Sequence, residues 1–423
     1  MAQRQVFRPL RDFLATEAAG GILAVGAALA AIIWANVAPH NYESLWSTEI
    51  AIRVGHHTLG LDLTHWVNDG LMAIFFLVVG LEIKRELVQG ELRELRRAAL
   101  PVAAALGGMI VPAGIFFAIN HGRSTGDGWG VPMATDIALA LGVVALVGSR
   151  LVPASLSLFL LAVAIVDDIG AIVVIAVFYS NGINVRWLIV GGGVVALTVL
   201  MQRLRVEAMT PYLLVGAALW LALHEAGIHA TIAGVIMGLL APTTAVLSPG
   251  IINEAELLDV STPQAAHESV TIARHSVSVV ERLEHALHPW SSFVIVPIFA
   301  LANAGIRLNS DLFDGVFSSH VFWGIVLGLM IGKPVGITLA SWIAVRTGAA
   351  EMPPGVRMAQ IGAIGCIAGI GFTVSLFVSD LAFGDPLDLG HAKFAILLAS
   401  IAAGLLSVVA LRSAARRSVQ WHP

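Results

Sequence analysis

The sequence predicts an all-α polytopic membrane protein, a single integral domain over residues 1–423 with about twelve transmembrane helices. Of its 423 residues, 57% are hydrophobic and only 12% are charged, which is too little polar surface to cover a soluble fold. Apolar runs of roughly 20 residues, the length that crosses a bilayer, recur from Phe13 to Leu411. The net charge of −4, without a clustered basic surface, argues against a nucleic-acid partner.

Hydropathy gives the positions of these spans, and the basic residues give their orientation. Most of the 24 Lys and Arg residues fall on the side that carries the N-terminus. With an even number of spans, the positive-inside rule places both termini on the cytoplasmic side of the membrane. The predicted spans are 13–38, 66–89, 98–119, 133–148, 153–179, 186–202, 209–223, 228–241, 290–304, 320–345, 356–379 and 391–412.

The segment between the first two spans predicts a β-hairpin on the outer face, within residues 45–64. Apolar and polar residues alternate over Glu49–Val54 and again over Leu59–Leu63, on either side of a turn at Gly55–Thr58. A lone hairpin is only marginally stable in water. It therefore serves either to pair with the same hairpin of a second subunit or to cap the outer face.

The longest connection, residues 242–289, is predicted to be cytoplasmic. It is polar at first and then becomes amphipathic, with apolar side chains at Ile272, Val277, Val280, Leu283 and Leu287. This pattern predicts disorder followed by a helix at the membrane interface.

Two spans differ from the rest and are predicted to be broken helices, numbers 4 and 11. The span 133–148 follows Gly128–Pro132 and carries Asp136, and the span 356–379 contains Gly369-Ile-Gly371 at its centre. Each is the middle member of a group of three helices, and the two groups start from opposite faces. Inverted three-helix repeats with broken helices in matching positions indicate an ion site near the membrane midplane.

Asp167 and Asp168 lie side by side in the middle of the span 153–179. A charge in hydrocarbon costs several kcal/mol, so buried acids at this depth indicate function. Two adjacent carboxylates have coupled titrations, and their oxygens suit a hard cation such as Na+. Such a site holds a cation when ionised and releases it when protonated. The structural alternative is a neutral Asp pair that only joins two helices.

Three further residues are expected to support this site. Lys333 lies well inside a span and needs a counter-charge, which the Asp167–Asp168 pair supplies. Where broken helices meet, Asp136 and Lys333 would offset the positive and negative helix ends respectively. A purely structural charge is the alternative for both, and Thr135 is a candidate hydroxyl ligand.

Acids and imidazoles also gather at the cytoplasmic ends of two spans. Their interleaving is typical either of a pH-responsive entrance or of a solvated ion-pair surface. These residues are Glu82, Arg85, Glu86, Glu284, His285 and His288.

Over nearly the whole chain, these residues resemble the NhaA-type Na+/H+ antiporter family. The resemblance implies crossed broken helices, a homodimer joined through the outer hairpin, and activation at alkaline pH. It also implies electrogenic export of one Na+ (or Li+) for two imported protons, with lipid as surroundings and no cofactor. The matching segments are Val79–Glu86, Ala134–Ala138, Val166–Gly170, Gly227–Thr231, Arg282–His285, His288–Trp290, Gly332–Pro334 and Gly371–Thr373.

The resemblance also implies roles for individual residues. Asp167 and Asp168 would bind Na+ or protons, and Lys333 would pair with Asp167. Asp136 would be the compensating charge of the broken helices. The six residues at the cytoplasmic ends would line the pH-responsive entrance.

Three other readings compete with an antiporter. A sodium-coupled symporter of an organic solute would share the broken helices, but it would need a more polar solute pocket. An intramembrane aspartyl protease with Asp136 and Asp168 as its dyad would need a Gly-x-Gly-Asp signature, which neither acid has. A channel suits repeats around one titratable site less well than a carrier does. The symporter is the alternative that stays open.

Overall fold

The computed structural model describes residues 2–54, 57–148, 151–180, 182–204, 206, 209–243 and 278–419. The chain forms two compact units. Unit 1 comprises Met1–Met72, Glu91–Asn181 and Ser292–Pro423, and unit 2 comprises Ala73–Gly90 and Gly182–Ser291.

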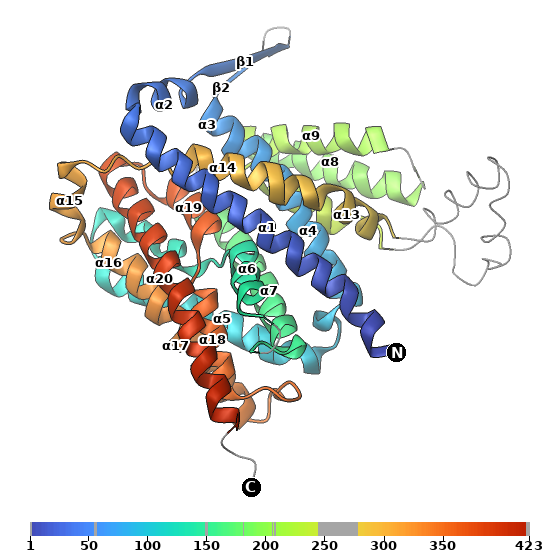
Figure 1. The fold of residues 1–423 in the computed structure, drawn as a ribbon. Helices are drawn as coiled ribbons and strands as arrows, with labels where there is room; N and C mark the ends of the chain where they lie inside the picture. The colour runs from blue at the N-terminus through green and yellow to red at the C-terminus, as the bar shows by residue number, and fades with distance from the viewer. Residues whose placement is uncertain are drawn as a thin grey trace, which may run out of the picture. The chain divides into compact units, whose positions relative to one another are not determined.

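Unit 1 is helical apart from one small hairpin (Figure 1). In it α1 packs against α6 and α14, and α17 packs against α5 and α18. Its helices are α1 (Ala2–Val37), α2 (Pro39–Trp46), α3 (Leu63–His65), the π-helical η1 (Trp66–Leu71), η2 (Glu91–Arg93), α5 (Leu95–Asn120), the 3-10 helix η3 (Ser124–Met133), α6 (Ile137–Val147), α7 (Ala154–Phe178), α14 (Val296–Asn303), α15 (Ser310–Val316), α16 (His320–Leu327), the π-helical η6 (Gly328–Gly332), α17 (Lys333–Arg346), α18 (Met358–Ala368), α19 (Phe372–Ala382) and α20 (Pro386–Val419).

Unit 2 contains five α-helices among the described residues, and the π-helical η5 (Ser291–Ile295) leads from it back into unit 1. Helix α9 contacts both α8 and α10. Its helices are α4 (Met72–Gln89, which begins on the last residue of unit 1), α8 (Val185–Arg203), α9 (Met209–Glu225), α10 (Ile232–Leu240) and α13 (Val279–Trp290).

Each predicted span coincides with a helix or with helices joined end to end. Among the described residues, 7 helices are long and apolar enough to cross a membrane, or up to 9 if each of two bent pairs counts as one span. The polytopic helical class is therefore confirmed. The count of twelve crossings and the inverted repeats stay predictions.

The predicted hairpin is present, with a shift at its second strand. The antiparallel strands are β1 (Glu49–Val54) and β2 (His57–Asp62), and Glu49 is paired with Asp62. The second strand begins two residues earlier than the alternation suggested.

The amphipathic helix expected after the long connection is α13. The side chains of Val280, Leu283 and Leu287 pack in a cluster with Leu81 and Ala241 of the same unit. Its apolar face therefore packs against protein, and the helix continues through η5 into α14. The sequence pattern alone could not separate a helix packed on protein from one lying at a membrane interface. The predicted disorder before it falls at residues 244–277, outside the described part of the chain.

Helices α5 and α17 of unit 1 approach each other so closely that backbone meets backbone. A Cβ added to Gly107 would collide with the carbonyl oxygen of Gly336, and one added to Gly336 would collide with that of Gly107. Only glycine, which has no Cβ, allows this approach. Because Lys333 begins α17, the contact fixes the helix that carries this lysine.

Candidate ion-binding site

Both predicted breaks are present, and the broken helices cross at them. The chain bends by 41° between η3 and α6 and by 52° between α18 and α19. At the crossing, the backbone N–H of Asp136 donates to the carbonyl of Ile370 at 2.7 Å. The second break falls at the predicted Gly369-Ile-Gly371. At the first, the predicted span included only α6, because the preceding half is a 3-10 helix rich in glycine rather than an apolar α-helix.

Asp136 joins the N-terminal ends of two half-helices. Its Oδ1 accepts from the backbone N–H of Leu139 in α6 at 3.0 Å. Its Oδ2 accepts from the backbone N–H and the hydroxyl of Thr373 in α19, at 3.0 and 2.6 Å. A helix N-terminus carries a partial positive charge, which a carboxylate stabilises. Asp136 therefore lies where an acid is expected to offset two positive helix ends.

Lys333 pairs with Asp167, and both side chains are buried, at 0% and 1% exposure. The Nζ atom of Lys333 contacts Asp167 Oδ2 and donates to the hydroxyl of Thr135 at 2.8 Å. The Thr135 hydroxyl in turn lies 2.6 Å from Asp167 Oδ2 and 3.0 Å from the carbonyl of Ala368. That carbonyl belongs to the C-terminal end of α18. Lys333 thus contacts Asp167 directly, and it reaches the negative C-terminal end of α18 through the hydroxyl of Thr135.

One oxygen of this group of buried residues is left without a partner. Asp167 Oδ1 is buried and accepts no hydrogen bond from the described residues. Asp168, the next residue of α7, is also buried and interacts electrostatically with Lys333. A buried carboxylate oxygen normally has a partner, since leaving it unsatisfied is costly. Asp167 Oδ1 is therefore an oxygen that a small cation could use, and the carboxylate of Asp168 follows it in the chain on the same helix.

The described residues contain no group of three or more His, Cys, Asp or Glu side chains that could hold a metal ion. The site is built from two carboxylates, hydroxyls and one ammonium. These groups suit a transported cation that is held weakly and released.

The candidate pH-responsive residues lie in unit 2. Arg85 of α4 forms an ion pair with Glu284 of α13, and His288 Nε2 lies 3.8 Å from Glu82 Oε1. Glu86 is buried on α4. Two contacts therefore join the acids and bases of α4 to those of α13, whereas His285 of α13 is exposed and contributes to the field at Glu284.

Thr373 is a site residue that the sequence prediction did not single out. Its backbone and its side chain both bond Asp136. Its position two residues after the Gly-Ile-Gly break could have indicated it, since the first turn of a half-helix has free N–H groups. Ser375, which donates to the carbonyl of Val131 at 2.9 Å, was likewise missed.

The fold and this site define a class, the polytopic membrane carriers in which two broken helices cross at a charged site. Comparison with known proteins identifies the group within that class. A sequence model of the family described as Na+/H+ antiporter 1 matches residues 11–411. The chain belongs to this family, whose members are secondary transporters and not enzymes.

Individual curated relatives are similar to this chain over nearly its whole length. The chain is 46% identical over 426 residues to the Na(+)/H(+) antiporter NhaA of Oleidesulfovibrio alaskensis, covering 96% of this chain and 94% of that protein. It is 43% identical over 415 residues to the Na(+)/H(+) antiporter NhaA of Escherichia coli O9:H4, covering 97% and 99%. Among solved structures, the sodium proton antiporter MjNhaP1 of Methanocaldococcus jannaschii has a TM-score of 0.50 at 13% identity, with 95% of both chains covered. That likeness shows the fold.

Proposed function

We propose that this protein exports Na+ (or Li+) in exchange for protons across the bacterial inner membrane, and that Asp167 and Asp168 bind both. The observation that carries the proposal is the unpartnered Oδ1 of Asp167, beside a second buried carboxylate and a buried ammonium. These two carboxylates can bind Na+ or protons. Binding both at once would leave uncompensated positive charge in the buried site, at a large cost in free energy.

Charge accounting favours electrogenic exchange. With Na+ bound, two ionised Asp side chains, the Lys333 ammonium and one Na+ sum to zero. With both Asp side chains protonated, only the ammonium charge remains, so the site carries one positive charge. Two protons inward for one Na+ outward then move one charge inward in each cycle, which a membrane potential drives with about 2.3 kcal/mol per 100 mV.

Competition for Asp167 couples the two substrates. The Lys333 ammonium already occupies Oδ2 of this carboxylate, so Na+ binding must weaken the pair or use Oδ1. Thr135 lies between the two charged groups and the C-terminal end of α18, so it can follow a change of partner. Asp136 continues to offset the positive N-terminal ends of α6 and α19 while the site exchanges Na+ for protons.

The charged residues of α4 and α13 are proposed to regulate exchange in response to cytoplasmic pH. Imidazoles change charge between about pH 5 and 8, and His288 lies near Glu82 beside the Arg85–Glu284 pair. Protonation there would alter the charge balance between the two helices. The outer hairpin, a two-stranded sheet with open edges, is the proposed contact of a homodimer, and the termini are proposed to be cytoplasmic.

The test is dequenching of a ΔpH-sensitive dye in inverted vesicles from an antiporter-deficient host, on adding Na+, Li+ and K+ in turn. We expect Na+-dependent dequenching that disappears in Asp168→Asn. The matched control is Glu43→Gln, which removes an acid paired with Arg307 outside the crossing and should leave exchange intact. If wild-type vesicles show no dequenching from about pH 6.5 to 9, a window covering shifted acids and imidazoles, the proposal fails and the symporter is favoured.

A further inference from the structure

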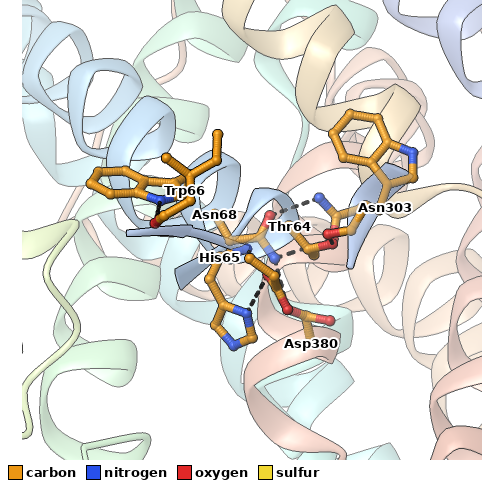
Figure 2. Close-up of polar contacts among 9 residues, drawn as sticks. Thr64, His65, Trp66, Asn68, Asn303 and Asp380 are labelled. Carbon is orange, nitrogen blue, oxygen red and sulfur yellow. Dashed lines mark hydrogen bonds and ion pairs between the residues drawn. The ribbon is translucent and has the colours of Figure 1, made fainter. Parts of the chain in front are cut away.

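A second buried polar network lies in unit 1, away from the crossing of the broken helices. Figure 2 shows Asn68 of η1 between Asn303 of α14 and Asp380 of α19. Asn68 Nδ2 donates to Asn303 Oδ1 at 3.2 Å and to Asp380 Oδ2 at 2.8 Å. Asn303 Nδ2 donates back to Asn68 Oδ1 at 2.7 Å. We call these three residues the amide junction.

The amide junction is costly to build and is fully satisfied. Asn68 and Asn303 are 6% and 1% exposed, and both donor and acceptor atoms of each amide are bonded, with Asn303 also donating to Phe299. Apolar side chains of the same size would pack here without needing matched partners. Matched amides instead fix how three elements are oriented, because each bond is directional.

The junction is itself anchored on its η1 side. Trp66 Nε1 donates to the carbonyl of Ile50 in β1 at 3.0 Å, and the Thr64 hydroxyl donates to the carbonyl of Trp46 at 3.2 Å. Figure 2 shows these contacts beside the junction, on residues that precede Asn68 in the chain by two and four positions. Asn68 is therefore held from one side by the hairpin and α2, and it presents its amide to α19 from a fixed position.

Helix α19 connects the junction to the ion site. It carries Thr373 in its first turn and Asp380 seven residues later. Seven residues of an α-helix make nearly two full turns, so these side chains lie on one face about 10 Å apart. Fixing the rotation of α19 at Asp380 consequently fixes the direction in which Thr373 presents its hydroxyl to Asp136. Phe377, between them, packs against Phe299 of α14 with ring centroids 6.2 Å apart.

We propose that Asn68 and Asn303 are positioning residues for cation exchange: through Asp380 they hold α19 in the rotation that keeps Thr373 on Asp136. This inference rests on the proposed function, because it assumes that the crossing of the broken helices is the transport site. It assigns a role to two amides that touch neither Asp167 nor Asp168.

The first test is Asn68→Leu, which keeps the size of the side chain and removes its bonds to Asn303 and Asp380. We expect the apparent KM for Na+ to rise about tenfold, the equivalent of one lost bond to a charged group, with a smaller change in maximal rate. Asn36→Leu is the matched control. Asn36 also bonds the chain after α14, at Ile306 and Leu308, but none of its hydrogen bonds within the described residues reaches α19, so its replacement should leave KM unchanged.

A second test swaps the amide of Asn68 with the carboxylate of Asp380, and it does not require that Asn68→Leu folds. Asn68→Asp places a carboxylate against Asp380 and should raise KM further. Asn68→Asp combined with Asp380→Asn restores one amide-to-carboxylate bond and should bring KM back toward the wild-type value. A purely structural role would change the melting temperature of the purified protein without this rescue.

The outcomes separate the two proposals. Loss of Na+-dependent exchange in wild-type vesicles overturns the proposed function and, with it, the role of the junction. Normal wild-type exchange with an unchanged KM in Asn68→Leu, or a double variant no better than Asn68→Asp, overturns the junction alone.

Discussion

Thr135 is the side chain on which the charges of the site converge. Its hydroxyl lies within hydrogen-bond distance of Asp167, Lys333 and the end of α18. A hydroxyl has one proton to donate and two lone pairs, so it can donate to only one of its two acceptors at a time. It can therefore exchange partners when the charge on Asp167 changes.

We expect Thr135→Val to raise the apparent KM for Na+ about tenfold, because it removes a hydrogen bond to a charged group while keeping the β-branched shape. Thr135→Ser keeps the hydroxyl and should stay close to the wild type. Dye dequenching over a range of Na+ concentrations measures both values. Equal KM values in the Val and Ser variants would show that the hydroxyl has no part in binding.

A second residue-scale prediction concerns alkaline pH. Burial raises the pKa of Tyr42 to about 12, and its hydroxyl lies within hydrogen-bond distance of the carbonyls of Leu301 and Ala302, at 2.9 and 2.7 Å. The unfolded chain releases this proton near pH 10 and the folded protein does so only near pH 12. Tyr42 thus contributes stability below pH 10 that is lost as the pH rises toward 12.

Tyr42→Phe should accordingly be less stable than the wild type at pH 8, and the difference between them should shrink by pH 11. Thermal unfolding of the purified proteins at the two pH values measures it. A difference that stays constant, or that grows with pH, contradicts the assignment.

The contacts of individual site residues were predictable for the few charged side chains inside the spans, and they were not predictable for the many uncharged polar side chains. Lys333 needed a counter-charge, and the acid pair of α7 was the available one, so that pairing followed from the sequence. Thr373 is an ordinary hydroxyl whose partner lies 237 residues away in the chain. Its role depends on how two broken helices cross, which no local pattern encodes.

At the scale of elements, the contact between α5 and α17 decides where Lys333 lies. Both helices approach through glycine, and the following turn of α17 packs on the same surface. Helices that meet backbone to backbone cannot shift without losing the contact over its whole length. The lysine is thereby held to the position set by α5.

Two glycine-to-alanine substitutions should change the stability of the folded protein in opposite directions. Gly107→Ala places a Cβ against the carbonyl of Gly336 and should destabilise the protein by about 1–3 kcal/mol, the usual cost of overpacking. Gly193→Ala, in α8, meets nothing within 4 Å and should stabilise it by up to about 1 kcal/mol. Thermal unfolding compares them, and a loss of stability in both variants would contradict the close-contact explanation.

A helix break was predicted correctly where glycine residues interrupt an apolar run. Gly369-Ile-Gly371 interrupts an otherwise apolar run, so its break was predicted at the right residues. The first half of the other broken helix, η3, was missed because it has neither the apolar length nor the composition of an α-helix. For α13, the apolar face was predicted correctly, but the surface that covers it was not.

At the scale of the whole molecule, two of the four points at which the chain passes between unit 1 and unit 2 lie in helical segments. The crossing at Met72 follows η1, and the crossing at Ser292 lies within η5. Both segments are π-helical, a rare geometry that is frequent at functional sites. Hydropathy reports only that a segment is apolar, so the division into two units could not be predicted from it.

The 3-10 geometry of η3 also has a consequence for the evolution of the family. A 3-10 helix rises about 2 Å and turns 120° per residue, so the 10 residues of η3 extend about 20 Å, where an α-helix of the same length would extend about 15 Å. One inserted or deleted codon in this stretch would rotate Thr135 and Asp136 by a third of a turn. Among related genes, we expect length variation to be depleted here and to collect in surface connections.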